Sequence, residues 1–366
     1  MTFPRGGMPA APTGVVADVD TDVVVIGAGQ AGLSSSYFLR RAGIGHVLLD
    51  SAPHAGGAWQ HYWPSLRYAD VHGFHALQDL PLIVPDPERP AAEVLSAYFT
   101  EYEQRFDLPV IRPVQVRSVR HDGPDFLVEA PEGSWRARGV INATGSWSHP
   151  LWPHYPGARE FLGRQLHTAH YRGPAGFAGQ RVVVVGGGAS ALRFLDELSP
   201  IAETIWVTRR EPEFSEAEFT PERGRAIIAR VEESVRAGKP PRSVVWNTGL
   251  ALTPLIKDLT ARGVLRRRPM FERITPDGVT WADGSHERVD TIIWATGFRA
   301  ALNHLAPLRL RAPGGGIVMA GGHPAAEPRL HLVGYGPSAS TIGANRAART
   351  AVGELRRELF PLGVAV

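Results

Sequence analysis

The chain contains no cysteine among its 366 residues. A protein without thiols cannot reduce a disulfide through a cysteine pair or bind a metal through thiolates, so both classes are excluded. Lysine occurs only as Lys239 and Lys257, and every other basic residue apart from histidine is arginine. Acidic and basic residues nearly balance at a net charge of +3, which gives no reason to expect binding to nucleic acid or to a membrane surface.

Long apolar runs are also missing. No run approaches the roughly 18 to 20 residues that span a bilayer. Residues 1–20 contain prolines and glycines but no apolar core of signal-sequence length, so we interpret them as a loose leader and expect a cytoplasmic protein. The histidine pairs are too scattered to predict a metal site: His72 and His75, His167 and His170, His323 and His331.

Glycine is plentiful, with 40 residues, and two glycine-rich turns have the same context. Each follows a four-residue aliphatic run, residues 23–26 or 182–185, and precedes a helical pattern. In such turns the first glycine permits a tight bend, the second lets the backbone approach a pyrophosphate, and the third position packs helix on strand. The pyrophosphate lies at a helix N-terminus. The predicted contacts are Gly27, Gly29, Gly32, Gly186, Gly188 and Ser190.

The two turns are followed by strand ends of opposite charge. The strand after the first turn ends in Asp50, and a carboxylate there suits the free hydroxyls of a ribose. The strand after the second turn ends in Thr208-Arg209-Arg210, and arginines there suit a 2′-phosphate. We assign the phosphate to Arg209, with Thr208 as a further hydroxyl contact. The arginines at 266–268 are interpreted as a solvated face.

Both halves close with a strand that enters the same tripeptide, ending in Thr144-Gly145 and Thr296-Gly297. A late strand enters a turn at Gly336, and a helix is expected from about Ser340 to Leu359. The predicted fold is α/β, with two Rossmann-like dinucleotide-binding domains, the second inserted into the first. The expected ranges are a leader at 1–20, a first domain at 21–150 and 300–366, and an inserted domain at 165–299.

The connection between the domains contains the pattern F-x-G-x-x-x-H-x-x-x-Y, formed by Phe161, Gly163, His167 and Tyr171. With Gly56-Gly57-Ala58-Trp59 and the order of all the motifs, this resembles the flavin-containing monooxygenases, over nearly the whole chain. The resemblance implies FAD on the first turn, with Trp59 and Gln60 near the flavin. It implies NADPH on the second turn, with NADH as a weaker donor, and a domain connection at His167.

This resemblance also implies the reaction. NADPH reduces the flavin, the reduced flavin forms a C4a-hydroperoxide with O2, and oxygen passes to a soft nucleophile. The apolar and aromatic content of the loop from Trp59 to Phe74 suggests a small sulfide, amine or ketone as the substrate. The alternatives are a flavoprotein reductase without oxygen insertion and a non-catalytic redox sensor. Asp70 and His72 are candidate catalytic residues beside the flavin, with loop hydrogen bonding as the alternative. The expected partners are O2 and a small-molecule substrate. The sequence allows a homodimer but does not predict the oligomeric state.

Overall fold

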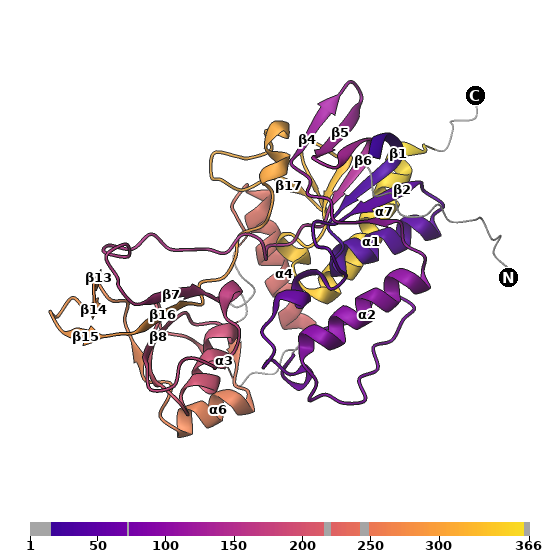
Figure 1. Cartoon of the computed structure of the whole chain (residues 1–366). Coiled ribbons are helices and arrows are strands. Elements are labelled where there is room, and N and C mark those ends of the chain that lie inside the picture. The colour runs from indigo at the N-terminus through magenta and orange to yellow at the C-terminus, as the bar shows by residue number, and fades with distance from the viewer. Residues whose placement is uncertain (1–15, 72, 216–220, 242–248, 362–366) are drawn as a thin grey trace, which may run out of the picture.

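The computed structural model describes residues 16–71, 73–215, 221–241 and 249–361. Two α/β domains lie side by side (Figure 1), which confirms the predicted fold class. Residues 1–15 of the predicted leader lie outside the described residues, as does His72. Strand β1 (Val16–Ile26) includes the last five residues of that leader, because they pair with β6 (Gly133–Asn142). No helix among the described residues is long and apolar enough to cross a membrane.

The first domain is built on a seven-stranded sheet. Strands β3 (Val110–Ile111), β2 (His46–Leu49), β1 and β6 run parallel in that order. Two antiparallel strands, β5 (Asp125–Ala130) and β4 (Ser118–Asp122), follow β6. The late strand β19 (Leu330–Leu332) also pairs with β6 in parallel. The C-terminal part of the chain thus completes the sheet that its N-terminal part begins.

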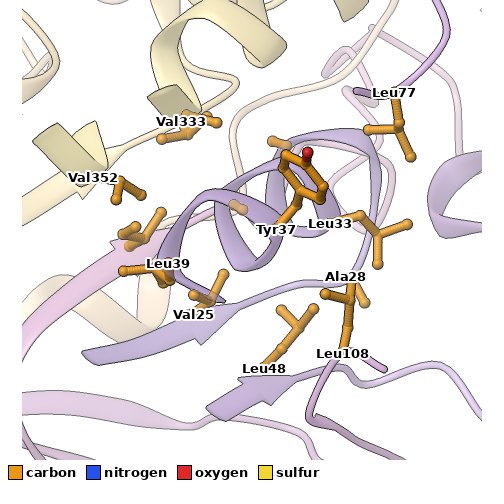
Figure 2. Close-up of a cluster of buried hydrophobic side chains, with 14 of the residues drawn as sticks. Val25, Ala28, Leu33, Tyr37, Leu39, Leu48, Leu77, Leu108, Val333 and Val352 are labelled. Atoms are coloured by element: carbon orange, nitrogen blue, oxygen red, sulfur yellow. The ribbon is translucent and has the colours of Figure 1, made fainter. Parts of the chain in front are cut away.

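Helices α1 (Gln30–Arg41) and α7 (Thr341–Leu359) pack against each other on one face of this sheet. Figure 2 shows Leu33 and Leu39 of α1 packing with Val25 of β1 and Val352 of α7 in one apolar core. Ser340 caps α7 through its hydroxyl, which accepts the Gly343 N–H at 3.1 Å. Helix α2 (Ala91–Arg105) buries Val94, Tyr98 and Tyr102, the face expected from their spacing.

The second domain is built on five parallel strands in the order β12-β9-β8-β16-β7. They are β12 (Arg267–Arg268), β9 (Glu203–Val207), β8 (Arg181–Val185), β16 (Thr291–Trp294) and β7 (Arg164–His167). Helices α3 (Ala189–Leu198) and α6 (Pro254–Ala261) share a core on one face. Strands β13 (Arg273–Thr275), β14 (Gly278–Thr280) and β15 (His286–Arg288) form a small antiparallel sheet whose apolar residues share the core on the other face.

Two segments that connect the domains, residues 145–151 and 297–301, pair with each other, and we call them the two crossings. Leu151 donates its N–H to the Gly297 carbonyl at 2.9 Å, and Arg299 donates to the His149 carbonyl at 2.9 Å. Pro150 and Phe298 form an antiparallel bridge at the same place. The two crossings are thus fixed to each other by backbone hydrogen bonds where they leave the first domain.

Helix α4 (Pro221–Arg236) falls within the range predicted for the inserted domain, yet it packs on the first domain (Figure 1). Val235 belongs to the core under the first sheet, together with Ile317, Met319 and Tyr335. The proposed domain range 165–299 thus includes a helix whose packing partner lies outside it. Sequence periodicity identifies the buried stripe of such a helix but not the surface that the stripe covers.

Short elements complete the described chain. They are the 3-10 turns η1 (Gly57–His61), η2 (Tyr68–Asp70), η3 (Thr168–His170), η4 (Asn303–Leu308) and η5 (Gly336–Ser338), and the strands β10 (Phe214–Ser215), β11 (Leu250–Ala251), β17 (Met319–Ala320) and β18 (His323–Pro324).

Candidate active site

A cavity of about 510 Å³ opens at the carboxyl ends of β1, β2 and β6. Its size lies in the range of about 300–1,000 Å³ that small-molecule and cofactor sites occupy. The lining includes the turn at Gly27 to Ala31, Asp50, the segment Trp59 to Tyr62, and Phe298 from the second crossing. The carboxyl edge of a parallel sheet is where open α/β folds bind ligands.

The glycines of the first turn have two different roles: two are required by packing, and one faces open space. Gly27 has φ +99°, and a Cβ there would lie 2.6 Å from the Ala143 carbonyl oxygen. A Cβ on Gly32 would lie 1.7 Å from the Gly27 carbonyl oxygen, so the packing of α1 on β1 requires a glycine. At Gly29 the nearest protein atom, the Gly57 Cα, would be 3.9 Å away. The protein therefore leaves open space at Gly29, on a helix N-terminus that has no side-chain cap, which fits an approaching pyrophosphate.

The second turn repeats this arrangement. Gly186 has φ +148°, and its Cβ would lie 2.4 Å from the Ala295 carbonyl oxygen, as Gly27 relates to Ala143. Gly188 is the N-cap of α3, and a Cβ there would meet no atom within 4 Å. Ser190 lies in the first turn of α3. Both helices thus begin with an uncapped N-terminus beside an open glycine, a geometry suited to two pyrophosphates.

Asp50 lies at the end of β2 and is only 7% exposed. One carboxylate oxygen accepts the Ala52 N–H at 3.2 Å, while the other has no hydrogen-bond partner and lies 3.5 Å from the Arg112 guanidinium. Burial raises the pKa of this carboxyl, and the Ala52 amide and Arg112 oppose the rise. A buried oxygen without a partner in the cavity wall fits a ribose hydroxyl as donor.

Arg112 was not found by sequence reasoning. Its guanidinium binds both oxygens of Glu103, at 2.6 and 2.8 Å, and Glu103 lies on α2. Arg112 follows β3, so the sheet brings it beside Asp50. A lone arginine before a proline gives no sequence signal for this position.

The wall of the cavity near the second domain is aromatic. Trp59 stacks on Tyr62 at 5.0 Å between ring centroids, Tyr62 lies 4.9 Å from Trp147, and Trp147 stacks on Phe298 at 4.9 Å. All four rings line the cavity. The sequence indicated Trp59 but gave no reason to single out Trp147 or Phe298, which come from the two crossings.

The other residues predicted for the first cofactor lie at several places. Gln60, Thr144 and Gly145 line the cavity, and Thr144 also donates its hydroxyl hydrogen to the Ala301 carbonyl at 2.6 Å. Gly336 is not among the lining residues, and a Cβ there would lie 3.2 Å from Val235 of α4. The neighbouring residues Ser338 to Thr341, at the start of α7, line the cavity instead.

At the end of β9, Thr208 is buried and its hydroxyl is already engaged. It accepts the Arg267 Nε–H at 2.7 Å and donates to the Arg210 carbonyl at 2.5 Å. Arg209 and Arg210 are exposed at this strand end. The interpretation of residues 266–268 as a solvated face is wrong for Arg267 and for Arg268, which binds Glu287 at 2.9 Å. Strand β12 pairs beside β9, a long-range contact that composition does not reveal.

The residues of the linker pattern lie in the second domain, and His167 bonds to one of the two crossings. His167 is fully buried, donates from Nε2 to the Gly297 carbonyl at 3.0 Å, and accepts the Ala169 N–H on Nδ1 at 3.2 Å. Burial lowers the pKa of His167, which keeps the imidazole neutral. Thr296 donates to the Leu151 carbonyl at 2.5 Å, so it too secures the crossings.

The two ends of the pattern are packed. Phe161 is 9% exposed in the core beneath the small sheet, and a Cβ on Gly163 would lie 2.5 Å from the Asp290 carbonyl oxygen. Tyr171 is fully buried and donates its hydroxyl hydrogen to Glu197 at 2.9 Å. These contacts of Phe161, Gly163 and Tyr171 lie within the second domain, so the connecting role of the pattern stays a prediction.

Asp70 does not line the cavity. Its carboxylate pairs with Arg193 of α3 at 2.5 Å, across the contact between the domains. Asp70 is thus engaged in a structural contact, but with a residue of the other domain and not, as the alternative expected, within its own loop. His72, the other candidate, lies outside the described residues.

The comparisons with known proteins agree with this geometry. Residues 24–243 match the family described as pyridine nucleotide-disulphide oxidoreductase. The solved structure of a flavin-containing monooxygenase from Stenotrophomonas maltophilia is 42% identical, covers 93% of this chain and 99% of its own, and superposes with a TM-score of 0.79. The chain belongs to the flavin monooxygenase family. It is an oxidoreductase of the FAD- and NADPH-dependent type.

More distant relatives have diverse names. An uncharacterized CzcO-like oxidoreductase from Geobacillus kaustophilus is 27% identical over 76% of this chain and 80% of its own length. An indole-3-pyruvate monooxygenase from Oryza sativa is 25% identical over 81% of this chain and 78% of its own length. The matches support a monooxygenase over a simple reductase or a redox sensor. The absence of cysteine separates this chain from disulfide reduction within the broader family.

Proposed function

We propose that this flavin monooxygenase uses NADPH to oxygenate a small apolar molecule, a sulfide, an amine or a ketone, against the aromatic wall of the cavity. The observation that carries the proposal is that the two crossings, which connect the two domains, supply two rings of that wall, Trp147 and Phe298, to a cavity that also contains the first glycine turn. An aromatic-walled cavity suits a substrate with little charge. The relatives named above as monooxygenases agree with this reaction class.

Each turn has a proposed ligand. Gly29 and the N-terminus of α1 would hold the pyrophosphate of FAD, and the free oxygen of Asp50 would accept a hydrogen bond from its ribose. Gly188, Ser190 and the N-terminus of α3 would hold the pyrophosphate of NADPH, and Arg209 would bind its 2′-phosphate. Bound FAD supplies the redox and oxygen chemistry. The side chains and backbone of the protein bind and orient the coenzymes and the substrate, and they keep water out of the cavity.

In the proposed reaction the coenzymes carry the electrons and the oxygen, so side chains of the protein need to transfer few protons. His304 lines the cavity, and its Nε2 donates to the Asn142 side-chain oxygen at 2.7 Å. Burial lowers the pKa of His304 to about 4, so its ring is neutral. Burial also lowers the pKa of His61, which stacks on Trp147. Neutral rings beside the aromatic wall favour an uncharged substrate. We also propose a cytoplasmic location, where NADPH is supplied to such enzymes.

The proposal is tested by a panel of probes with the FAD-loaded protein. NADPH consumption, O2 uptake and peroxide release are measured with methyl phenyl sulfide, a tertiary amine and a cyclic ketone. We expect at least one probe to raise NADPH consumption and lower the peroxide fraction. Peroxide equal to the NADPH consumed with all three probes would contradict the proposal and indicate an oxidase without oxygen transfer.

A further inference from the structure

Trp63 belongs to the first domain in sequence, but it is packed in the core of the second. Its ring lies 5.1 Å from Phe194 of α3 and 5.5 Å from Tyr171, by ring centroids. The side chain is 2% exposed, and Leu66 and Ala91 of the first domain join the same core. A buried indole N–H requires an acceptor. That acceptor comes from the second domain.

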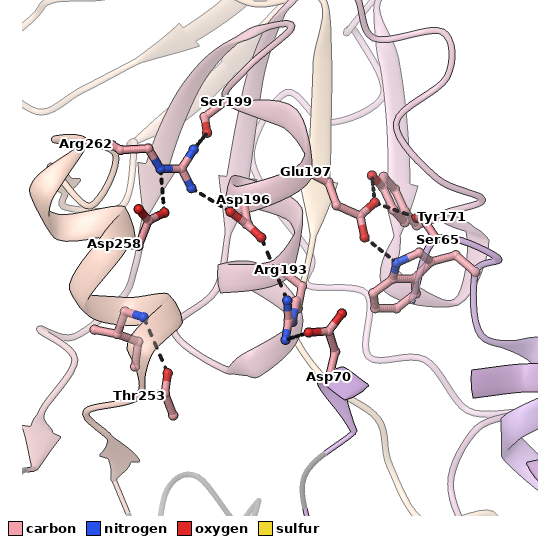
Figure 3. Close-up of polar contacts among 12 residues, drawn as sticks. Ser65, Asp70, Tyr171, Arg193, Asp196, Glu197, Ser199, Thr253, Asp258 and Arg262 are labelled. Carbon is pink, nitrogen blue, oxygen red and sulfur yellow. Dashed lines mark hydrogen bonds and ion pairs between the residues drawn. The ribbon is translucent and has the colours of Figure 1, made fainter. Parts of the chain in front are cut away.

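The acceptor is Glu197, in the last turn of α3. Its Oε1 accepts the Trp63 Nε1–H at 2.8 Å, and its Oε2 accepts the Ser65 hydroxyl at 2.8 Å and the Tyr171 hydroxyl at 2.9 Å. One carboxylate thus joins two residues of the first domain to the last residue of the linker pattern (Figure 3). Hydrogen bonds to an ionised acceptor are roughly twice as strong as neutral ones.

A second contact joins the same helix to the same loop. Arg193 lies one turn before Glu197 and pairs with Asp70 at 2.5 Å (Figure 3). Residues four apart lie on one face of a helix, so both contacts belong to the face of α3 that meets the first domain. The N-terminus of this helix is the open turn at Gly188.

The loop that Glu197 holds continues directly into the cavity wall. Trp59 and Tyr62 line the cavity, and Trp63 and Ser65 follow them in the chain. Helix α3 therefore carries an open glycine turn at one end and a bonded piece of the cavity wall near the other.

We propose that Glu197 is a positioning residue, which fixes α3 to the cavity wall and thereby sets where the nicotinamide of NADPH meets the flavin. The inference rests on the proposed roles of Gly29 and Gly188. Hydride transfer needs the reacting atoms about 3–3.5 Å apart, and a displacement of about 1 Å can lower the rate a hundredfold. A loosened α3 would place the nicotinamide poorly without altering the FAD site.

Two substitutions of Glu197 distinguish the loss of its hydrogen bonds from a change in its charge. Glu197→Leu removes every acceptor and leaves the buried Trp63 N–H and Tyr171 hydroxyl unpaired. Glu197→Gln keeps one oxygen for Trp63, and its amide can donate to Ser65 and Tyr171, whose hydroxyl oxygens also accept. We expect Glu197→Gln to behave like the original protein and Glu197→Leu to be impaired. The matched control is Glu203→Gln, which alters an exposed pair with Arg181 in the same domain.

The first readout is structural and needs no turnover. Because the chain has no cysteine, Glu101→Cys on α2 and Lys257→Cys on α6, both exposed in the original protein, place spin labels at only two sites, one in each domain. The distance distribution between the labels is measured by pulsed electron paramagnetic resonance with FAD bound. We expect Glu197→Leu to broaden it and Glu197→Gln and Glu203→Gln to leave it unchanged.

The second readout is the rate at which saturating NADPH reduces bound FAD without O2, followed in a stopped flow. We expect Glu197→Leu to lower this rate about tenfold or more with FAD occupancy unchanged. Neither readout uses an oxygenation substrate, so failure of the proposed oxygenation would leave this test intact. If Glu197→Leu does not fold, Tyr171→Phe and Trp63→Phe each remove one donor and are expected to give smaller effects in the same direction.

An unchanged distance distribution and reduction rate in Glu197→Leu, or in both milder variants, would overturn the proposal. A lower melting temperature as the sole effect would do the same, because it would assign Glu197 a purely structural role. Equal impairment in Glu197→Gln and Glu197→Leu would overturn the hydrogen-bond basis.

Discussion

The Arg112 guanidinium lies 3.5 Å from the Asp50 carboxylate while it binds both oxygens of Glu103. Asp50 is thus held by a cation that Glu103 has already oriented. One of its oxygens stays without a hydrogen-bond partner at the wall of the cavity. The pair places an acceptor where the proposed FAD ribose would donate.

Asp50→Ala should therefore weaken FAD binding. A hydrogen bond to a charged group contributes about 1.5 to 3 kcal/mol, which corresponds to roughly one to two decades in the dissociation constant. The constant is measured by titrating apoprotein with FAD and following the quenching of flavin fluorescence. Asp20→Ala serves as the control, since Asp20 is an exposed residue of the same domain. Equal FAD affinity in Asp50→Ala and Asp20→Ala would remove Asp50 from the site.

Gly29→Ala and Gly188→Ala should fold normally but lose one coenzyme each. A Cβ at these positions meets open space in the protein, so it would compete only with a bound pyrophosphate. We expect Gly29→Ala to weaken FAD and Gly188→Ala to weaken NADPH, each about tenfold or more, which is about 1.4 kcal/mol. Titration calorimetry gives both affinities, and thermal melting reports folding.

Substitutions of two further glycines serve as controls for that experiment. Gly353→Ala, in a helix with open space around the glycine, should leave both affinities unchanged. Gly32→Ala should fail to fold, because its Cβ would lie 1.7 Å from a backbone oxygen. If Gly29→Ala and Gly188→Ala bind both coenzymes as the original protein does, the pyrophosphate assignments are incorrect.

The features of the fold that depend on contacts between residues close in sequence could be predicted, and those that depend on contacts between distant residues could not. Buried parallel strands are continuous aliphatic runs, so residues 23–26 of β1, strand β8 and the turns after them could be placed from the sequence, whereas the polar first half of β1 could not. Ser340 and the periodic apolar residues after it located α7, because helix caps and helix stripes are local signals. The family resemblance then supplied the order of the two coenzymes.

Side-chain partners across the fold could not be predicted in the same way. Nothing in the local sequence says that β12 pairs beside β9, so Arg267 was not connected with Thr208. Asp70 read as a loop acid near the flavin, but its partner Arg193 lies far along the chain. The acceptor for Trp63 could not be guessed for the same reason. Such pairings require the tertiary structure.

Coenzyme preference should follow Arg209. An arginine at this strand end contributes a charge-assisted bond to a 2′-phosphate, about 1.5 to 3 kcal/mol. We expect kcat/KM to favour NADPH over NADH in the original protein, and Arg209→Gln to lower that preference by one to two decades. Arg210→Gln is the matched neighbour and should have a smaller effect, because successive side chains at a strand end point to opposite sides. Equal efficiency with both coenzymes in the original protein would refute the assignment.

His167 should act through the connection and not through proton transfer. Both ring nitrogens are engaged, and burial lowers its pKa, so the ring stays neutral through the physiological range. We expect His167→Ala to raise the peroxide fraction while the shape of the pH–rate profile stays the same. The measurement is steady-state turnover from pH 5.5 to 9, within about the usual working range. Disappearance of a titration near an ordinary histidine pKa of about 6.5 would instead make His167 an acid or base.

The same lowered pKa has a consequence for stability. The folded protein binds fewer protons at His167 than the unfolded chain does, so the contribution is complete above the unfolded pKa of about 6.5 and decreases as the pH falls below it. Urea unfolding at several pH values should therefore give a flatter acid-side slope for His167→Ala than for the original protein. His286→Ala is a more exposed comparison. Parallel slopes for all three proteins would contradict a lowered pKa at His167.

The central claim, oxygen transfer driven by NADPH, is tested most directly by the origin of the oxygen atom in the product. The FAD-loaded protein is given NADPH, isotopically labelled 18O2, and the probe that most lowers peroxide release, and the product is analysed by mass spectrometry. We predict one labelled oxygen atom in each product molecule and one NADPH consumed for each, after correction for released peroxide. A product without label, or NADPH consumption that ends entirely as peroxide, would contradict the account.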